Sequence, residues 1–528
     1  MGNAVTKYAP LAVIVLAQMV ITGDNAIIGI ITAVWMVAFS TSIDQIQMAN
    51  AVYALTSAAF MTAGGMLGLA IGWRRIFVIG AALLAVGEAV TMLAPNIQTI
   101  IWVARVLCGL GAALLVPATI GLCAVLYRGR ELGIAFGSIG AASGVASILI
   151  PIMSGIVIEK LDWRWMYAAL AIVLVLTAIA GQALLPKKQT TEERFRIDYV
   201  GIVLAGAGVV FLTVGLTKLA VWGWWTALDA PFTIFGLSPA LPMLVLGALI
   251  LVVLVKYEVW VEKKHSDCLL PSIFVTNGQV RNGLYMNSFQ FLCLGAVMFM
   301  IISWLQIVVN YDPLLTAVAV LIMPLSMIIF SVGIPIVFYR ASPCIICTVA
   351  VLLSAVACPF MIFGMEQASV NILLYIGLFI MGCAQGMIAS QASMIVSQSV
   401  SDSQAAQSGG IQAAMRSIGS VIGLTVIGAS LVLSLNSGFK SDINAAHFRE
   451  YVVNQVNEIK VVGFVSDKDV DSFLGQRAIT TNEQVAIKQI YAANRLQAAR
   501  IALWVLCVVA LLHLLALKYV PRQPFSQQ

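Results

Sequence analysis

The chain has 528 residues, of which 61% are hydrophobic and only 10% are charged, and its mean hydropathy is +0.99. Soluble globular domains carry about 25% charged residues, so this composition excludes an ordinary soluble protein and indicates an integral membrane protein. The formal net charge of +6 is not concentrated in a basic cluster, which argues against nucleic acid as a partner.

Fourteen apolar segments are long enough to cross a bilayer as helices, which takes about 20 residues each. They are residues 8–35, 47–70, 76–93, 99–125, 132–158, 165–185, 199–220, 240–260, 283–309, 314–339, 343–365, 372–396, 406–435 and 500–520. The first segment is too long for a removed signal peptide and lacks its small-residue cleavage pattern, so we interpret it as the first span. The sequence therefore predicts an all-α membrane protein with 14 transmembrane helices.

Basic residues in the loops predict the orientation of the chain, since an even number of spans places both termini on one side. The loops on that side carry the larger basic set: Arg74, Arg75, Arg128, Arg130, Lys187, Lys188, Arg194, Arg196, Lys256, Lys263, Lys264, Arg281 and Arg340. The opposite loops contain little beyond Lys160, Arg164 and Lys218. Because loops rich in Lys and Arg face the cytoplasm, we expect both termini to be cytoplasmic and the long loop 436–494 to be external.

The sequence contains no pattern that indicates a cofactor or a metal. The nine cysteines lie mostly within spans, and Cys344 and Cys347 lack a second ligand pair, so we expect them to be buried structural residues. The three histidines are scattered, and the phosphate-binding pattern G-x-x-x-x-G-K-S/T does not occur. The sequence thus predicts neither an enzyme nor an ATP-driven pump.

Three charged residues of the first half lie at membrane depth. Counted at ~1.5 Å of rise per residue, Asp24, Glu88 and Arg105 all fall in the central to outer half of the membrane. A carboxylate at that depth must be paired, hydrated or protonated, so these residues are candidates for proton coupling. A static ion pair between Glu88 and Arg105 is the structural alternative.

Small residues follow Arg105 at spacings of three or four. The stripe in the fifth span includes Gly137, Gly140, Gly144, Pro151 and Gly155. On a helix these residues share one smooth face, against which a second helix can pack closely within lipid. The stripe indicates either static close packing or a moving interface beside the charged residues.

The second half of the chain repeats the pattern of the first more weakly. Its small residues recur in the spans 372–396 and 406–435, where Arg416 lies near the entry of a span, but it has no acid at comparable depth. Such internal symmetry is typical of transporters built from two helix bundles around a midplane site. We therefore predict a six-helix bundle at 1–186, a linker with two further spans at 187–281, and a second bundle at 282–528 that includes the loop 436–494.

Short motifs occur in a fixed order along nearly the whole chain. They lie at residues 24–28, 101–111, 151–155, 163–165, 198–201, 305–314 and 416–419. The first resembles the element D-x-T-I-V, the second the arginine motif of a fourth span, and the third the antiporter motif G-P-x-x-G-G. Together the motifs resemble the fourteen-helix drug:proton antiporter family of the major facilitator superfamily. This resemblance implies two six-helix bundles with two linker helices, and multidrug efflux across the inner (plasma) membrane.

The resemblance also implies roles for individual residues. Asp24 would exchange a proton against an amphipathic, cationic substrate, with Glu88 as an accessory acid and Arg105 tuning both. Membrane lipids would surround the protein, and no cofactor is implied. The conformational motifs would include Pro151, Gly155 and Arg416.

The loop after the second span departs from the family pattern. The glycines and arginines match at Gly65, Gly72, Arg74 and Arg75, but Leu69 and Ala70 stand where the family has Asp and Arg. The family's aspartate is associated with locking the two bundles, so we expect the lock here to be weaker or built from other residues. Two alternatives to efflux remain open: an uptake symporter on the same fold, and a non-transporting membrane scaffold or sensor, which the missing aspartate favours.

Overall fold

The computed structural model describes residues 2–41, 43–187, 197–223, 225, 230, 232–234, 236–264, 268–338, 340–446, 448–459, 462–475 and 479–523. Within these ranges the chain is helical, and the only strand-like pairings are the isolated bridges Ile234–Leu237 and Met365–Val370. Lys188, Arg194 and Arg196, three of the basic loop residues, lie outside the described ranges. The predicted all-α membrane fold is confirmed.

The first bundle is formed by the N-terminal helices. They are α1 (Gly2–Ala38), α2 (Ile43–Ile71), α3 (Trp73–Leu93), α4 (Ile97–Thr99), the π-helical turn η1 (Ile100–Ala104), α5 (Arg105–Leu126), α6 (Gly129–Lys160) and α7 (Arg164–Leu184). Helix α3 packs against α5 and α7, α2 packs against α5, and α1 packs against α6. Continuous apolar stretches with few charges produce these long helices, because in lipid every backbone polar group must be satisfied within its own segment.

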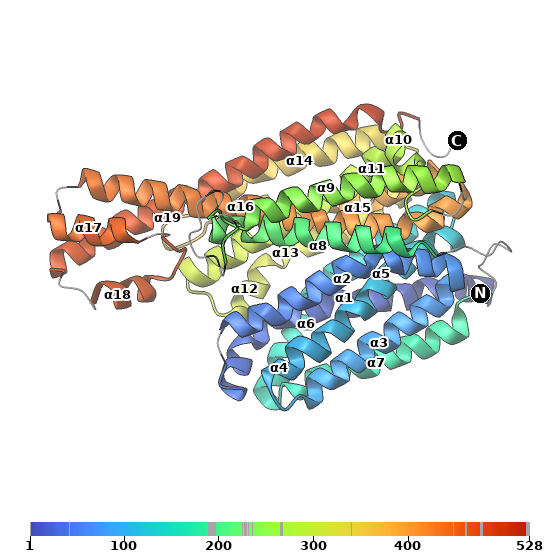
Figure 1. Ribbon diagram of the computed structural model, residues 1–528, viewed down its shortest axis with the longest axis horizontal. Coiled ribbons are helices and arrows are strands. Elements are labelled where there is room, and N and C mark those ends of the chain that lie inside the picture. The colour runs from blue at the N-terminus through green and yellow to red at the C-terminus, as the bar shows by residue number, and fades with distance from the viewer. Residues whose placement is uncertain are drawn as a thin grey trace.

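A helical hairpin connects the first bundle to the second. It consists of α8 (Tyr199–Trp222) and α9 (Ala240–Lys264), and the short α10 (Ile273–Thr276) follows it. Helix α8 packs against α9 and also against α2 and α16, so the hairpin touches both bundles (Figure 1).

The second bundle follows the hairpin. Its elements are α11 (Gly278–Ser303), the π-helical turn η2 (Trp304–Val308), α12 (Pro313–Val320), α13 (Ile322–Val337), α14 (Pro343–Gly364), α15 (Ile372–Gln398), α16 (Asp402–Ala445), α17 (Glu450–Glu458), α18 (Asp467–Gly475), α19 (Thr481–His513) and the 3-10 turn η3 (Leu514–Tyr519). The main packing partners are α14 with α15, α11 with α16, α13 with α15, and α16 with α19.

Thirteen helices within the described residues are long and apolar enough to cross a membrane. They correspond in order to the second through fourteenth predicted spans. The first predicted span falls in α1, whose helix is 37 residues long and includes the apolar segment Tyr8–Asp24. Both termini lie at one end of the molecule, which we call the terminal end (Figure 1).

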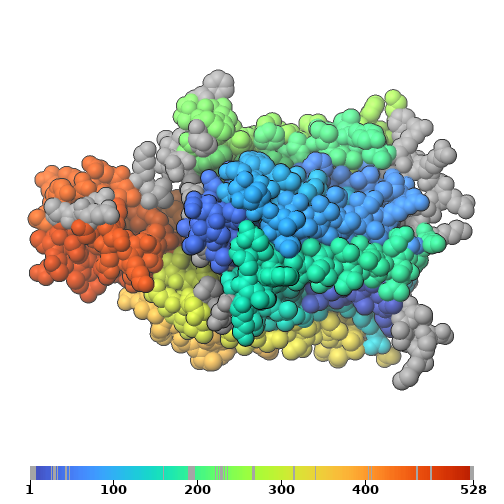
Figure 2. Space-filling model, turned by 90° about the horizontal axis from the view of Figure 1, so that it is seen from below, coloured from blue at the N-terminus to red at the C-terminus, as the bar shows by residue number. Residues whose placement is uncertain are grey.

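The prediction of a long loop at 436–494 is wrong. Helix α16 continues to Ala445 and α19 already begins at Thr481, so most of this segment is helical. The two helices continue because they pack against each other and bury apolar side chains, among them Phe439, Ile443 and Ile487. Together with α17 and α18 they form a projection at the end opposite the termini, standing clear of the bundles (Figure 2). The expected short amphipathic helix corresponds to α17, which buries Val452 and Val456.

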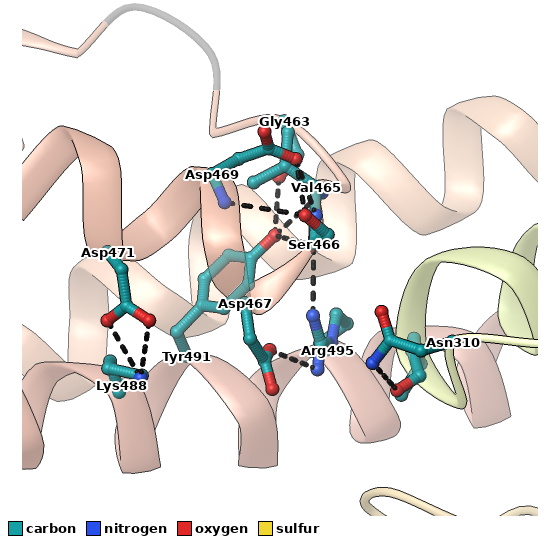
Figure 3. A network of polar contacts seen from close by, with 11 residues as sticks. Asn310, Gly463, Val465, Ser466, Asp467, Asp469, Asp471, Lys488, Tyr491 and Arg495 are labelled. Atoms are coloured by element: carbon teal, nitrogen blue, oxygen red, sulfur yellow. Dashed lines mark hydrogen bonds and ion pairs between the residues drawn. The ribbon is translucent and has the colours of Figure 1, made fainter.

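A polar network stabilises the projection (Figure 3). The Tyr491 hydroxyl donates to the Gly463 carbonyl at 2.8 Å and accepts from the Val465 amide at 2.9 Å. Arg495, buried beneath, forms an ion pair with Asp467 at 2.8 Å and donates to the Val465 carbonyl at 2.9 Å. The segment between α17 and α18 is thus fixed to α19.

The two bundles contact each other through small residues. Helix α6 packs against α13 and α15, and α16 packs against α2 and α5. A Cβ on Gly65 would lie 2.8 Å from the Gly410 Cα, and one on Gly144 would lie 2.9 Å from Ile328. Real Cβ atoms do not approach so closely, so these backbones are as near as glycine permits.

Candidate functional site

A buried ion pair joins the first and fourth spans. The Arg105 Nη1 atom lies 2.7 Å from the Asp24 Oδ1 atom, and both side chains have 0% exposure. Arg105 is the first residue of α5 and follows the π-helical turn Ile100–Ala104. A π turn contains one extra residue and is frequent at functional sites, since it changes the direction of the side chains that follow it. Of motif 24–28, only Asp24 and Ile27 have described side chains.

Three aromatic rings surround the Arg105 guanidinium. The rings of Trp35, Tyr53 and Tyr167 each lie 5.9 Å from its central carbon. The Tyr167 hydroxyl accepts from Nη2 at 3.4 Å, and the Tyr167 ring stacks on Trp35 at 5.8 Å. Aromatic faces attract a cation, by about 2 kcal/mol or more once it is desolvated. The cage therefore replaces part of the hydration that Arg105 loses on burial.

Glu88 of α3 completes the charged group. It is fully buried and lies close enough to interact electrostatically with both Asp24 and Arg105, while the Cys108 thiol donates to its Oε1 atom at 3.9 Å. Asp24 Oδ2 and Glu88 Oε2 are buried without a hydrogen-bond partner among the described residues. Two carboxylates and one guanidinium would leave one uncompensated negative charge, which is costly to bury. One proton bound to either carboxylate would neutralise the group.

A separate polar cluster joins α1 to α6. The Gln18 amide donates to Ser143 of α6 at 3.1 Å and to Thr22 at 3.3 Å, and the Thr22 hydroxyl lies 3.3 Å from that of Ser143. Gln18 and Thr22 precede Asp24 on α1 by six and two residues, and Ser143 is adjacent to Gly144 on α6. The polar surface thus reaches the helix that contacts α13 and α15.

Arg416 of α16 occupies a different environment in the second bundle. It donates to the side-chain amide oxygen of Asn287 at 3.1 Å and to the Ser393 hydroxyl at 3.0 Å, and the Phe291 ring lies 5.4 Å away. The Asn287 amide in turn donates to Gln412 at 3.2 Å. Within the described ranges Arg416 has no ion-pair partner. Its charge is therefore balanced by neutral dipoles alone.

The other predicted site residues lie away from the charged group. Gly72 has φ +98°, a conformation that residues with a side chain rarely adopt, and it begins the turn into α3. Arg74 donates to the Gln182 carbonyl of α7, and Arg75 is exposed. Pro151 lies inside α6, and nothing lies within 4 Å of a Cβ built on Gly155.

The structure differs from sequence reasoning in two respects. Arg105 pairs with Asp24, whereas the structural alternative had paired it with Glu88. The cage residues Trp35, Tyr53 and Tyr167 were not singled out, and neither were Asn287 and Gln412. A search for aromatic residues at the predicted depth of Arg105 in neighbouring spans would have included the cage.

These features define a polytopic membrane transporter: two helix bundles in contact through small residues, with buried charges inside. A family model of the Major Facilitator Superfamily matches residues 14–424, and the chain belongs to this family. Its members are transporters rather than enzymes.

Two curated relatives are bacterial resistance proteins. This chain is 32% identical over 314 residues to the puromycin resistance protein pur8 of Streptomyces alboniger, covering 59% of this chain and 58% of the relative. It is 28% identical over 214 residues to the tetracenomycin C resistance and export protein of Streptomyces glaucescens, covering 40% of each. Each match thus spans less than two thirds of the relative's length.

A solved structure has the same fold. The human organic anion transporter MFSD10 superposes with a TM-score of 0.60, covering 97% of this chain and 99% of that chain at 12% identity. At this identity the likeness concerns the fold alone.

Proposed function

We propose that this protein is a proton-coupled antiporter that exports amphipathic, cationic compounds by alternating access. The observation that carries the proposal is the buried group of Asp24, Glu88 and Arg105, which contains two acids and one base. A purely structural ion pair would need only one acid. The second acid gives the group a place for a proton that can be exchanged.

The proposed exchange is a competition at Asp24. A proton arriving from outside neutralises Asp24 and weakens its ion pair with Arg105, which is then free to pair with Glu88. When the site faces the cytoplasm, a cationic substrate favours ionised Asp24 and the proton leaves inward. One proton moving inward supplies ~2.3 kcal/mol per 100 mV of membrane potential, which can sustain a substrate gradient.

Export and orientation are inferred from related observations. Two relatives are named for resistance, one of them also for export, which supports outward transport. The basic residues near the terminal end support a cytoplasmic position for both termini and insertion in the plasma membrane. We retain the division into bundles at 1–186 and 282–528 with a linker at 187–281.

Substrate-induced proton release tests the coupling. Purified protein in weakly buffered detergent is mixed with a panel of lipophilic cations, and the pH change is recorded. Asp24→Asn should abolish the release, whereas Glu88→Gln, a matched change in the same group, should reduce it less. Release that survives in Asp24→Asn and is lost in Glu88→Gln would reverse the two roles.

Transport in inverted membrane vesicles separates export from its alternatives. An exporter accumulates the cation inside such vesicles when a proton gradient is imposed, and an uptake symporter depletes it. A scaffold or sensor would do neither, and that result would contradict the proposal.

A further inference from the structure

A second pair of acids lies outside the site described above, where the linker hairpin meets both bundles. Glu258 of α9 has 0% exposure, and its Oε2 atom accepts from the Leu269 amide at 2.8 Å and the Leu270 amide at 3.2 Å. Asp198, which caps α8, accepts at Oδ1 from the Gly201 amide at 2.9 Å and from the Tyr257 hydroxyl at 3.2 Å. One oxygen of each carboxyl is therefore fully occupied.

The other two oxygens lie beside the same glycine, and neither accepts a hydrogen bond from a described residue. Glu258 Oε1 and Asp198 Oδ2 are buried and have no hydrogen-bond partner among the described residues. Both converge on Gly201: a Cβ built there would overlap Glu258 Oε1 and lie 2.7 Å from Asp198 Oδ2. Two ionised carboxylates in this position would repel each other, whereas one proton between them would form an O–H···O bond.

Among the described residues, no base neutralises the pair. Along the described ranges neither acid forms an ion pair, and the titratable group that contacts the pair is Tyr257 of α9, whose hydroxyl donates to Asp198. Helices α2 and α16 present the neutral side chains of Met66 and Gln407. A positive particle small enough for the space between the two oxygens would neutralise the pair.

The pair is connected to both bundles at the terminal end. The Asp198 amide contacts the Met66 sulfur of α2 at 3.3 Å. The loop held by Glu258 accepts from Gln407 of α16, at 2.6 Å to the Cys268 carbonyl. Met66 is adjacent to Gly65, and Gln407 is one turn from Gly410, so both contacts flank the close approach of α2 and α16.

We propose that Asp198 and Glu258 bind one proton between them, and that this proton holds the linker hairpin against α2 and α16 and keeps the terminal end closed. Opening that end requires α2 and α16 to separate, which breaks the contact to Met66 or the contact to Gln407. Loss of the proton would drive the carboxylates apart and loosen the hold on both helices. The pair would then perform the locking role of the family's Asp and Arg. In this chain those two positions are Leu69 and Ala70, which carry no charge. This proposal rests on the alternating access of the proposed function.

Infrared difference spectroscopy tests for the proton directly. Full-length protein in lipid is titrated with pH, and the C=O stretch of a neutral carboxylic acid is followed. Glu258→Gln and Asp198→Asn should each remove one component of this band. Both changes retain an acceptor oxygen, so the neighbouring hydrogen bonds are preserved. Glu262→Gln is the matched control, because Glu262 lies one turn further on α9 and accepts from the Ser272 amide at 2.9 Å. Spectra of both variants identical to wild type would overturn the proposal, and so would a band that responds to sodium rather than to pH.

Distance measurements test the lock. Spin labels at Lys187→Cys and Arg340→Cys, exposed positions at the terminal ends of the two bundles, report opening in a background whose nine native cysteines are replaced. The Asp24→Asn and Glu88→Gln changes are included, so the pH response of the first site is absent. The closed-to-open ratio should change with pH by up to about tenfold per unit, the limit for one coupled proton.

In Glu258→Gln the side-chain amide is a hydrogen-bond donor at every pH. The terminal end of this variant should therefore remain closed at every pH. Glu262→Gln should respond like its parent. A pH response retained in Glu258→Gln would overturn the lock. Because the first site is inactivated in this background, the result does not depend on whether Asp24 couples transport.

Discussion

The two arginines inside the helix bundles have opposite surroundings. Arg105 has 0% exposure, an acid at 2.7 Å and a second acid nearby. Arg416 is half-buried and is held by an amide oxygen, a hydroxyl and an aromatic ring. The same side chain is thus stabilised by opposite charge in one bundle and by neutral dipoles in the other.

This difference distinguishes a site that can exchange a proton, around Arg105, from a site that only holds a fixed positive charge, around Arg416. Within the described ranges, only the surroundings of Arg105 contain carboxyl groups that can gain or lose a proton. Asn287 and Ser393 cannot do so, and the positive charge of Arg416 is therefore fixed. Under the proposed function, coupling belongs to the first bundle, and removing each arginine should have a different effect.

The largest effect is expected for Arg105→Met. The change leaves Asp24 buried without its partner, and breaking a buried pair in this way costs about 3–5 kcal/mol. We expect a corresponding fall in the unfolding free energy measured by chemical denaturation in detergent. The double variant Arg105→Met with Asp24→Asn should recover most of the loss, because the orphaned charge is then gone. If the double variant is no more stable than Arg105→Met, the lost stability comes from the contacts between Arg105 and the aromatic cage, and not from the unpaired charge of Asp24.

Arg416→Met should have a smaller effect. It removes two hydrogen bonds and leaves neutral groups, one of which, Asn287, keeps its bond to Gln412 at 3.2 Å. Leaving such groups unsatisfied costs about 1–3 kcal/mol. The same denaturation measurement, made beside Arg105→Met, gives the ranking. If Arg416→Met is the more damaging change, an acidic partner is present at that site in solution and the comparison fails.

The long helices and the deep charges were predictable because both are local properties of the sequence. An apolar run of sufficient length must form a helix in lipid, and position along the run gives depth. Depth alone does not give direction around the helix axis. The structural alternative therefore pairs Arg105 with Glu88, whereas in the structure Arg105 follows the π-helical turn at Ile100–Ala104 and pairs with Asp24.

The aromatic cage and the Asp198–Glu258 pair could not be found in the same way. Trp35, Tyr53 and Tyr167 come from three different helices, and in sequence each resembles an aromatic residue facing lipid. Glu258 lies among lysines near the end of α9, where a charged residue is ordinary. Its burial depends on the loop that folds back to place the Leu269 and Leu270 amides on it. Tertiary contacts of this kind leave no periodic signal.

The smallest expected effect is that of Tyr167→Phe. This change tests which groups besides Asp24 hold Arg105 in place. The hydroxyl of Tyr167 accepts from Nη2 at the long distance of 3.4 Å, whereas its ring stacks on Trp35 at 5.8 Å and remains in phenylalanine. Removing the hydroxyl should cost no more than about 0.5–1.5 kcal/mol of unfolding free energy and should leave substrate-induced proton release intact. Tyr167→Leu, the matched change that removes the ring as well, should cost more because the contact between the cation and the aromatic face is lost. Equal losses in the two variants would show that a neutral hydrogen bond secures Arg105, as neutral hydrogen bonds secure Arg416. The contrast between the two arginines would then rest on Asp24 alone.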